Sequence, residues 1–225
     1  MTLTSPERVV FPKGKITKQE VADYYLSVAP KILPHLKGRV LSLVRCPGGV
    51  GDCHYFRQDP RVSNAKELME HVQQNTIEFH INTPDIMVFD LDPGEGLGLG
   101  KVRQGARDLK SILDELGLKS TIKTSGGKGY HIMVAGGDYE FSQKVAQLME
   151  AKWPNRYTIN IRKDARGGKI FVDYLRNSPN STSVAPYSLR AKDKATVSMP
   201  ISWEQLGAVK PDLVTIKNIG KWLQS

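Results

Sequence analysis

The stretch from Ile86 to Gly94, Ile-Met-Val-Phe-Asp-Leu-Asp-Pro-Gly, constrains the fold more than any other part of the sequence. Side chains alternate between the two faces of a β-strand, so a strand here puts Asp90 and Asp92 on one face and Leu91 on the other. Two carboxylates on one face repel each other unless a divalent cation or a basic group offsets their charge. The stretch therefore indicates either a metal site or a strand end whose aspartates cap the next turn.

The segments that follow the aspartates have a β-α-β-β-α-β order. An amphipathic segment that ends at Gly117 predicts a helix, and two apolar runs around a glycine-rich five-residue turn predict a β-hairpin. The elements expected after the first strand are a helix at residues 103–116, hairpin strands at 120–124 and 130–134, a helix at 142–153 and a strand at 169–175. With an additional strand at 157–162 set aside, this order predicts an α/β (α+β) fold. Its sheet is the split βαββαβ sheet of ferredoxin-like and RNA-recognition-type proteins.

The first 80 residues precede this pattern and have elements of their own. Thr17 and Glu20 have the spacing of a capping box, which predicts a helix over residues 18–33. A strand is expected at residues 39–45. We therefore expect a single domain over residues 1–225, in which an N-terminal lobe of residues 1–80 packs on a catalytic core of residues 81–225.

The predicted topology brings a third carboxylate to the first two. The first strand of a split βαββαβ sheet lies between the third and fourth strands, so Asp173 comes within reach of Asp90 and Asp92 if the registers match. Three convergent carboxylates can hold two divalent cations, an arrangement suited to phosphoryl or nucleotidyl transfer. Hard oxygen ligands favour Mg²⁺ or Mn²⁺ over Zn²⁺.

The turn at residues 125–129, Ser-Gly-Gly-Lys-Gly, is a candidate phosphate-binding element. Its glycines allow the backbone to approach an anion closely, although glycine-rich hairpin tips are also common without such a function. His131 is expected on the same face as the aspartates. Lys163 and Arg166 precede the last strand and are expected to contact a triphosphate.

The charge of the chain points to a polyanionic partner. The formal net charge is +9 and the isoelectric point is near 9.5, and no stretch is long and apolar enough to span a bilayer, so we expect nucleic acid rather than a membrane. Arg8, Lys13 and Lys18 form either a phosphate site or a solvated basic loop. Tyr55 and Phe56 are adjacent in a predicted strand, so at most one belongs to the core and the other can stack on a base.

Cys46 and Cys53 are the only cysteines. They are too few for a disulfide framework and lack metal-site spacing, so we expect reduced thiols in a cytoplasmic protein. The N-terminus lacks the apolar region of a signal peptide, so export is not expected.

Taken together, these motifs resemble the polymerase domain of bacterial DNA ligase D, within the archaeo-eukaryotic primase superfamily. The resemblance extends over nearly the whole chain, and its motifs occur in the family's order. They are the segments 89–94 (Phe-Asp-Leu-Asp-Pro-Gly), 123–129 (Lys-Thr-Ser-Gly-Gly-Lys-Gly) with His131, 171–177 (Phe-Val-Asp-Tyr-Leu-Arg-Asn) and 184–190 (Val-Ala-Pro-Tyr-Ser-Leu-Arg).

The resemblance implies roles for individual residues. Asp90, Asp92 and Asp173 are similar to the catalytic metal-binding carboxylates of the family. The implied nucleotide-binding residues are Ser125, Gly127, Lys128 and His131 of the hairpin, together with His80, Arg166 and Arg190. Arg8 and Lys18 resemble a basic pair that recognises a 5′-phosphate on DNA, and Tyr55 and Phe56 an aromatic pair that packs against the template strand.

The implied activity is template-dependent nucleotidyl transfer, by a DNA-directed polymerase or primase, to primer 3′ ends at gaps or double-strand breaks. The implied cofactors are two divalent metal ions, Mn²⁺ or Mg²⁺, and the implied substrates are NTP or dNTP and DNA with a 5′-phosphorylated gap or break. Ku and a DNA ligase acting in trans are the expected partners in end joining, with a nucleoid-associated location in the cytoplasm and no membrane.

Three other functions are compatible with parts of the sequence. A stand-alone primase-polymerase of the same superfamily has the same motifs. A haloacid-dehalogenase-type phosphatase also has a Phe-Asp-Leu-Asp strand, but that family requires Gly-Thr where Pro93 and Gly94 stand here. A DNA-end-binding module with a decayed site is the non-enzymatic alternative, and the presence of all three aspartates argues against decay.

Overall fold

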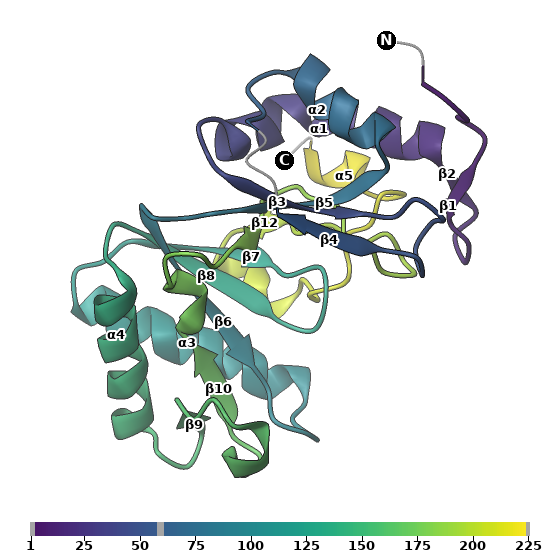
Figure 1. The fold of residues 1–225 in the computed structure, drawn as a ribbon. Helices are drawn as coiled ribbons and strands as arrows, with labels where there is room; N and C mark the ends of the chain where they lie inside the picture. The colour runs from purple at the N-terminus through teal and green to yellow at the C-terminus, as the bar shows by residue number, and fades with distance from the viewer. Residues whose placement is uncertain (1–2, 58–60, 224–225) are drawn as a thin grey trace. The chain divides into compact units, whose positions relative to one another are not determined.

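The computed structural model describes residues 3–57 and 61–223, which form two compact units (Figure 1). The first unit comprises the described residues within Met1–Asn82, Thr182–Met199 and Asp212–Ser225, and the second comprises Thr83–Ser181 and Pro200–Pro211. Residues 182–199 and 212–225 were predicted to lie in the catalytic core. They belong to the first unit because β11 (Ser183–Val184) pairs with β5 (Thr76–Ile81), and Thr196 pairs with Thr215.

The second unit is built on a six-stranded sheet in the order β12-β7-β8-β6-β10-β9. Strand β6 (Ile86–Asp92) lies between β8 (Tyr130–Ala135) and β10 (Ile170–Asp173), antiparallel to both. Strand β7 (Ser120–Thr124) forms the predicted hairpin with β8. The edges are β12 (Pro200–Ile201) and β9 (Tyr157–Thr158), and β9 pairs in parallel with β10. The predicted split βαββαβ sheet is confirmed, and the strand set aside in the prediction extends it at one edge.

The core of the second unit lies between the sheet and helices α3 (Leu99–Glu115) and α4 (Tyr139–Lys152). Met87, Phe89 and Leu91 occupy every second position of β6, and each is at most 1% exposed in this core. Since Asp90 and Asp92 take the intervening positions, they point to the opposite face of the sheet. Burial of one face of β6 thereby fixes the side on which the carboxylates lie.

The first unit has a four-stranded sheet in the order β11-β5-β3-β4, with β3 at Leu41–Arg45 and β4 at His54–Arg57. Helices α1 (Lys18–Leu36) and α2 (Ala65–Gln73) pack on one face of this sheet, where Phe79 contacts Tyr25 of α1 and His71 of α2 edge-on. The capping box of Thr17 and Glu20 is confirmed at the start of α1. The opposite face of the sheet carries polar residues. Among them are Ser42 and His80, which the register places opposite each other.

Smaller elements complete both units. In the first they are β1 (Val9–Phe11), β2 (Ile16–Thr17) and α5 (Gly220–Leu223). In the second they are the 3₁₀ turns η1 (Lys163–Ala165), η2 (Leu175–Asn177) and η3 (Glu204–Gly207). Across the described parts of the chain, no helix combines the length and apolar character needed to cross a membrane.

The two cysteines are paired, and the expectation of reduced thiols is therefore wrong for this structure. A disulfide joins Cys46, which follows β3, to Cys53, which precedes β4. Since β3 and β4 are antiparallel neighbours, the end of one strand lies beside the start of the next, and the seven-residue separation does not keep the two thiols apart. The number and spacing of the cysteines along the chain do not reveal this pairing, which depends on the strand pairing.

Gly94, directly after β6, lies against the backbone that leads into β10. Its amide donates to the carbonyl of Lys169 at 3.1 Å. A Cβ added at Gly94 would lie 2.7 Å from the carbonyl carbon of Gly168 and 2.8 Å from the carbonyl oxygen of Lys169. Both distances are shorter than a van der Waals contact, so only glycine lets these two loops lie together at the end of the strand pair that carries the aspartates.

We expect Gly94→Ala to destabilise the protein by about 1–3 kcal/mol, because a backbone segment must move to admit the methyl group. Urea unfolding followed by circular dichroism measures this loss. Gly100→Ala is the matched control, since Gly100 lies in α3 with no atom within 4 Å of its added Cβ. Because alanine has a higher helix propensity than glycine, this substitution should leave the free energy of unfolding unchanged or raise it by roughly 0.5–1 kcal/mol. Equal effects of the two substitutions would contradict the close approach at Gly94.

Candidate active site

Four polar side chains form a row across four adjacent strands of the second unit, on the face opposite α3 and α4. The register pairs Lys123 with His131, His131 with Asp90, and Asp90 with Asp173. We call these four residues the cross-strand row. Lys123 Nζ lies 2.9 Å from His131 Nδ1, and His131 Nε2 lies 3.6 Å from Asp90 Oδ2. The predicted convergence of Asp90 and Asp173 thus follows from direct cross-strand pairing.

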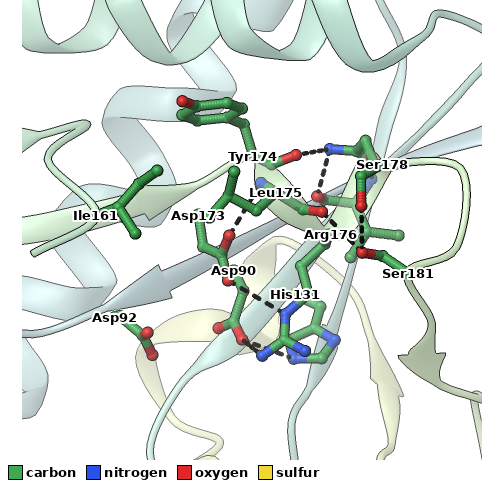
Figure 2. Close-up of polar contacts among 12 residues, drawn as sticks. Asp90, Asp92, His131, Ile161, Asp173, Tyr174, Leu175, Arg176, Ser178 and Ser181 are labelled. Carbon is green, nitrogen blue, oxygen red and sulfur yellow. Dashed lines mark hydrogen bonds and ion pairs between the residues drawn. The ribbon is translucent and has the colours of Figure 1, made fainter.

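Arg176 connects the two carboxylates of the row (Figure 2). Its Nη2 donates to Asp90 Oδ2 at 3.3 Å, and its Nε lies 3.2 Å from Asp173 Oδ2. Arg176 belongs to one of the motifs of the family resemblance but had no predicted role. The only sequence signal of a role for Arg176 was its position three residues after Asp173, near the end of a predicted strand.

The turn after β10 explains how Arg176 reaches the carboxylates. Strand β10 ends at Asp173, whose Oδ1 accepts the amide of Leu175 at 2.9 Å. The carboxamide of Asn177 accepts from the amide of Val88 at 2.6 Å and donates to its carbonyl at 3.0 Å. Asn177 therefore continues the hydrogen bonding of β6 where β10 has ended, and it fixes the 3₁₀ turn η2 that carries Arg176.

Burial sets the protonation of this carboxylate pair. Burial, together with the charges of Asp92 and Asp173, raises the pKa of Asp90 to about 6, against the opposing effect of Arg176 and Lys123. Burial also raises the pKa of Asp173, opposed by Arg176 and by the amide of Leu175. The local positive charges therefore only partly compensate the buried acidic groups.

Asp92 lies on the same face at the end of β6 but apart from this pair (Figure 2). Its side chain is 48% exposed, and the nearest cation is Arg166, with Nη1 at 4.0 Å from Asp92 Oδ2. Arg166 is held over the ring of Phe171, 4.0 Å from its centroid, and donates to the carbonyls of Asn160 and Ile161. Among the residues that the structure describes, no three acidic, histidine or cysteine side chains form a ready-made metal cluster.

The hairpin turn is organised by Ser125, whose hydroxyl oxygen accepts the amides of Gly127 at 3.2 Å and Gly129 at 3.3 Å. Lys128 is exposed at the tip. Ser125 is only 8% exposed and adjoins Thr124, the last residue of β7, so the turn is attached directly to the strand that carries Lys123. The structure thus groups the predicted hairpin residues of the nucleotide site with His131, Arg166 and the three aspartates in one unit.

His80 and Arg190 belong to the first unit. His80 lies on β5, and Arg190 lies in the extended segment after β11. Both contact Glu78, whose Oε2 is 2.8 Å from His80 Nε2 and 3.0 Å from Arg190 Nε. Glu78 had no predicted role, although its position two residues before His80 puts both on one strand face.

Arg8 and Lys18 lie at the other predicted DNA contact. The Arg8 guanidinium donates to the carbonyl of Pro47 and to the side chain of Asn75. Lys18 is 4% exposed, and its ammonium donates to the carbonyls of Thr4 at 3.1 Å and Gln73 at 2.8 Å. Burial and the nearby Arg8 lower the pKa of Lys18. Within the described residues, neither cation forms an ion pair with a carboxylate.

Tyr55 and Phe56 lie on opposite faces of β4, as expected for neighbours in a strand. Tyr55 is 57% exposed, its hydroxyl is 2.8 Å from the hydroxyl of Thr182, and its ring lies edge-on to His80 at 5.9 Å. Phe56 is partly buried beneath the guanidinium of Arg45, 5.1 Å from the ring centroid. The two rings do not form one continuous aromatic surface.

Comparisons with known proteins match this fold and these motifs. Residues 17–63 and 58–225 match the family described as LigD, primase-polymerase domain. The "Multifunctional non-homologous end joining protein LigD" of Mycolicibacterium smegmatis is 31% identical over 91% of this chain and 32% of that protein. The protein of the same name from Pseudomonas aeruginosa is 33% identical over 92% of this chain and 29% of that protein. The chain thus spans about a third of the length of these relatives.

A solved structure agrees in fold along the whole chain. The "Polymerase Domain from Mycobacterium tuberculosis Ligase D in complex with DNA" superposes with a TM-score of 0.93 at 28% identity, covering 100% of this chain and 94% of that one. The aspartates, the hairpin turn and the sheet that joins them therefore occur in a chain that belongs to the LigD primase-polymerase domain family.

Proposed function

We propose that this chain is a template-dependent nucleotidyltransferase that adds nucleotides to primer 3′ ends at DNA gaps or double-strand breaks. The observation that carries the proposal is the direct pairing of Asp90 with Asp173 on a polar sheet face, one strand away from the glycine-rich hairpin. Family membership supports polymerase chemistry, and the names of the curated relatives refer to non-homologous end joining. A haloacid-dehalogenase-type phosphatase is not favoured, because the family match extends over most of the chain.

The donor set of the site fits hard divalent cations such as Mn²⁺ or Mg²⁺. Its candidate ligands, Asp90, Asp92 and Asp173, offer only carboxylate oxygens, and a divalent cation would stabilise the charged forms of Asp90 and Asp173, whose pKa values burial raises. When bound, two such ions supply Lewis-acid activation of the primer hydroxyl and charge neutralisation at the pyrophosphate leaving group.

The chain's own residues supply binding and orientation. Lys128 at the hairpin tip and Arg166 beside Asp92 provide positive charge for a triphosphate, and the Ser125 hydroxyl keeps the hairpin in one conformation. His131 is held between Lys123 and Asp90, so its ring has a fixed orientation beside the carboxylates. Arg176 keeps Asp90 and Asp173 at a fixed separation before the substrate enters.

The first unit is proposed to contact the nucleotide through His80 and Arg190 and the DNA through Arg8 and Lys18. Arg8 and Lys18 are neighbouring cations whose partners among the described residues are neutral oxygens, which suits them to a 5′-phosphate. Tyr55, the more exposed of the aromatic pair, is the better placed to meet a template base. In end joining, Ku and a DNA ligase acting in trans are the proposed partners, and the bacterial nucleoid is the proposed location.

Asp173→Asn and Asp90→Asn should each reduce primer extension at least a thousandfold while DNA affinity stays within about threefold of the wild type, because an amide is a poor ligand for hard cations. Extension of a 5′-phosphorylated gapped duplex with Mn²⁺ and either NTP or dNTP measures the activity. Asp114→Asn, which removes an exposed carboxylate paired with Lys110 on α3, is the control and should retain full activity. Near-normal extension by either active-site variant would refute the assignment.

The raised pKa of Asp90 predicts a pH-dependent stability without metal. The native state holds the Asp90 proton more tightly than the unfolded state does, so stability should fall as pH rises from about 4 to about 6. Asp90→Asn should therefore raise Tm at pH 7.5 in EDTA by several degrees, equivalent to roughly 1–3 kcal/mol. The gain should vanish at pH 4.

Differential scanning fluorimetry across this pH range tests the expectation. Addition of Mn²⁺ at pH 7.5 should raise the Tm of the wild type more than that of Asp90→Asn, because the cation relieves the same repulsion. A Tm gain of Asp90→Asn that is independent of pH would argue against ionised Asp90 as its cause.

Arg8→Gln should abolish the preference for a 5′-phosphorylated gap over a 5′-hydroxyl gap. We expect the ratio of the two Kd values to fall towards one, since the variant loses a cation that faces the phosphate. Fluorescence anisotropy with the two duplexes measures the ratio. Lys15→Gln, which removes an equal charge from the nearby loop, is the control and should preserve the ratio. An unchanged ratio in Arg8→Gln would exclude Arg8 from phosphate recognition.

A further inference from the structure

Glu78 is a buried carboxylate at the centre of the polar face of the first unit's sheet. Its side chain is 8% exposed, and the register places it opposite Val44 in the interior of the sheet. Three donors converge on it. Its Oε2 accepts from His80 Nε2 at 2.8 Å and from Arg190 Nε at 3.0 Å, and its Oε1 accepts the amide of Ala191 at 2.7 Å.

These contacts keep the carboxylate charged in spite of its burial. Burial alone would raise the pKa of Glu78, but the hydrogen bond from His80, the charge of Arg190 and the amide of Ala191 together lower it. An ionised carboxylate only accepts hydrogen bonds, so the His80 nitrogen that faces it carries a proton. The orientation and the protonated nitrogen of the imidazole are thus both fixed by Glu78.

The same carboxylate fixes Arg190 in two ways. The side chain is held through Nε, which orients the plane of the guanidinium, and the backbone is held through the amide of the next residue, Ala191. Arg190 is further held by its own amide, which donates to the carbonyl of Thr196 at 2.8 Å. One side chain on β5 therefore connects a strand residue, His80, to a segment more than a hundred residues later in the chain.

We propose that Glu78 is a positioning residue for nucleotide binding, which holds His80 and Arg190 in the relative arrangement in which both engage the incoming nucleotide. This proposal rests on the proposed function, in which His80 and Arg190 are nucleotide contacts. Glu78 itself touches neither the nucleotide nor the reacting atoms. Its loss should weaken nucleotide binding through two residues at once, with a smaller effect on the chemical step and none on DNA affinity.

Two substitutions and a matched control separate positioning from general stability. Glu78→Gln retains the shape but loses the charge, and whichever way the amide turns, its NH₂ group faces a donor. Glu78→Met retains the approximate volume and removes all three hydrogen bonds. Asp108→Asn is the control, because Asp108 of α3 is also a buried carboxylate, paired with Arg156 at 2.8 Å and hydrogen-bonded to Gln104 at 2.8 Å and Tyr157.

Steady-state extension of a gapped duplex gives the first measurement. We expect the KM for nucleotide to rise about tenfold in Glu78→Gln and at least fiftyfold in Glu78→Met, with kcat within about fivefold of the wild type and the Kd for DNA unchanged. Asp108→Asn should lose a similar amount of thermal stability with an unchanged KM. An unchanged KM in both Glu78 variants, accompanied by a Tm loss like that of Asp108→Asn, would show that Glu78 is only a structural anchor.

The ¹⁵N spectrum of the His80 imidazole, recorded without nucleotide or metal, gives the second measurement. We expect a proton on Nε2 in the wild type and in Asp108→Asn, and a changed nitrogen shift pattern in Glu78→Met. An unaltered pattern in Glu78→Met would overturn the inference. Absence of any nucleotide incorporation by the wild type would instead refute the proposed function, so the two failures are distinguishable.

Discussion

The pairing of Asp90 with Asp173 across adjacent antiparallel strands is the constraint on which the rest of this site depends. Two carboxylates in one register position repel each other, and burial makes that repulsion stronger because little solvent screens it. Two cations offset part of this repulsion. Arg176 spans both carboxylates from η2, and Lys123 acts from two strands away through His131. The compensation is incomplete, as the raised pKa values show. A site whose buried carboxylates are only partly compensated favours the binding of further positive charge, as expected of a cation-dependent centre.

The surrounding structure is arranged to preserve that register. Leu91 and its apolar neighbours on β6 bind the opposite face of the strand to α3 and α4, so a slip of one residue would bury the aspartates in the apolar core. Asn177 replaces the missing strand beyond Asp173 by hydrogen bonding to both backbone groups of Val88. Gly94 lets the loop after β6 lie against the backbone before β10. These three contacts, one apolar, one polar and one steric, act on the same pair of strands.

The first unit has a similar arrangement, in which the central side chain is a carboxylate instead of a cation. There a single carboxylate, Glu78, is placed between His80 and Arg190, and the donors that surround it keep it ionised. In both units one charged side chain, Arg176 or Glu78, contacts two candidate site residues, of which one is two or three positions away in sequence and the other lies in a distant segment. Arg8 and Lys18 differ from these clusters, because the partners that the described part of the chain offers them are neutral oxygens. That difference suits them to an anion that comes from outside the protein.

The sequence by itself determined the strand that carries Asp90 and Asp92, the hairpin around Ser125, the order of the elements in the second unit and the capping box of α1. Each of these depends on local periodicity or on turn and cap residues a few positions apart. Only the tertiary structure decided which residues support the site. Arg176 reaches Asp90 on β6, Lys123 reaches His131 on β8, and Glu78 reaches Arg190 in the segment after β11, so these contacts depend on how the segments pair. The disulfide between Cys46 and Cys53 and the return of residues 182–199 to the first unit likewise follow from strand pairing. A pattern along the chain specifies the face on which a side chain lies, whereas its neighbours on that face are set by pairing between segments distant in sequence.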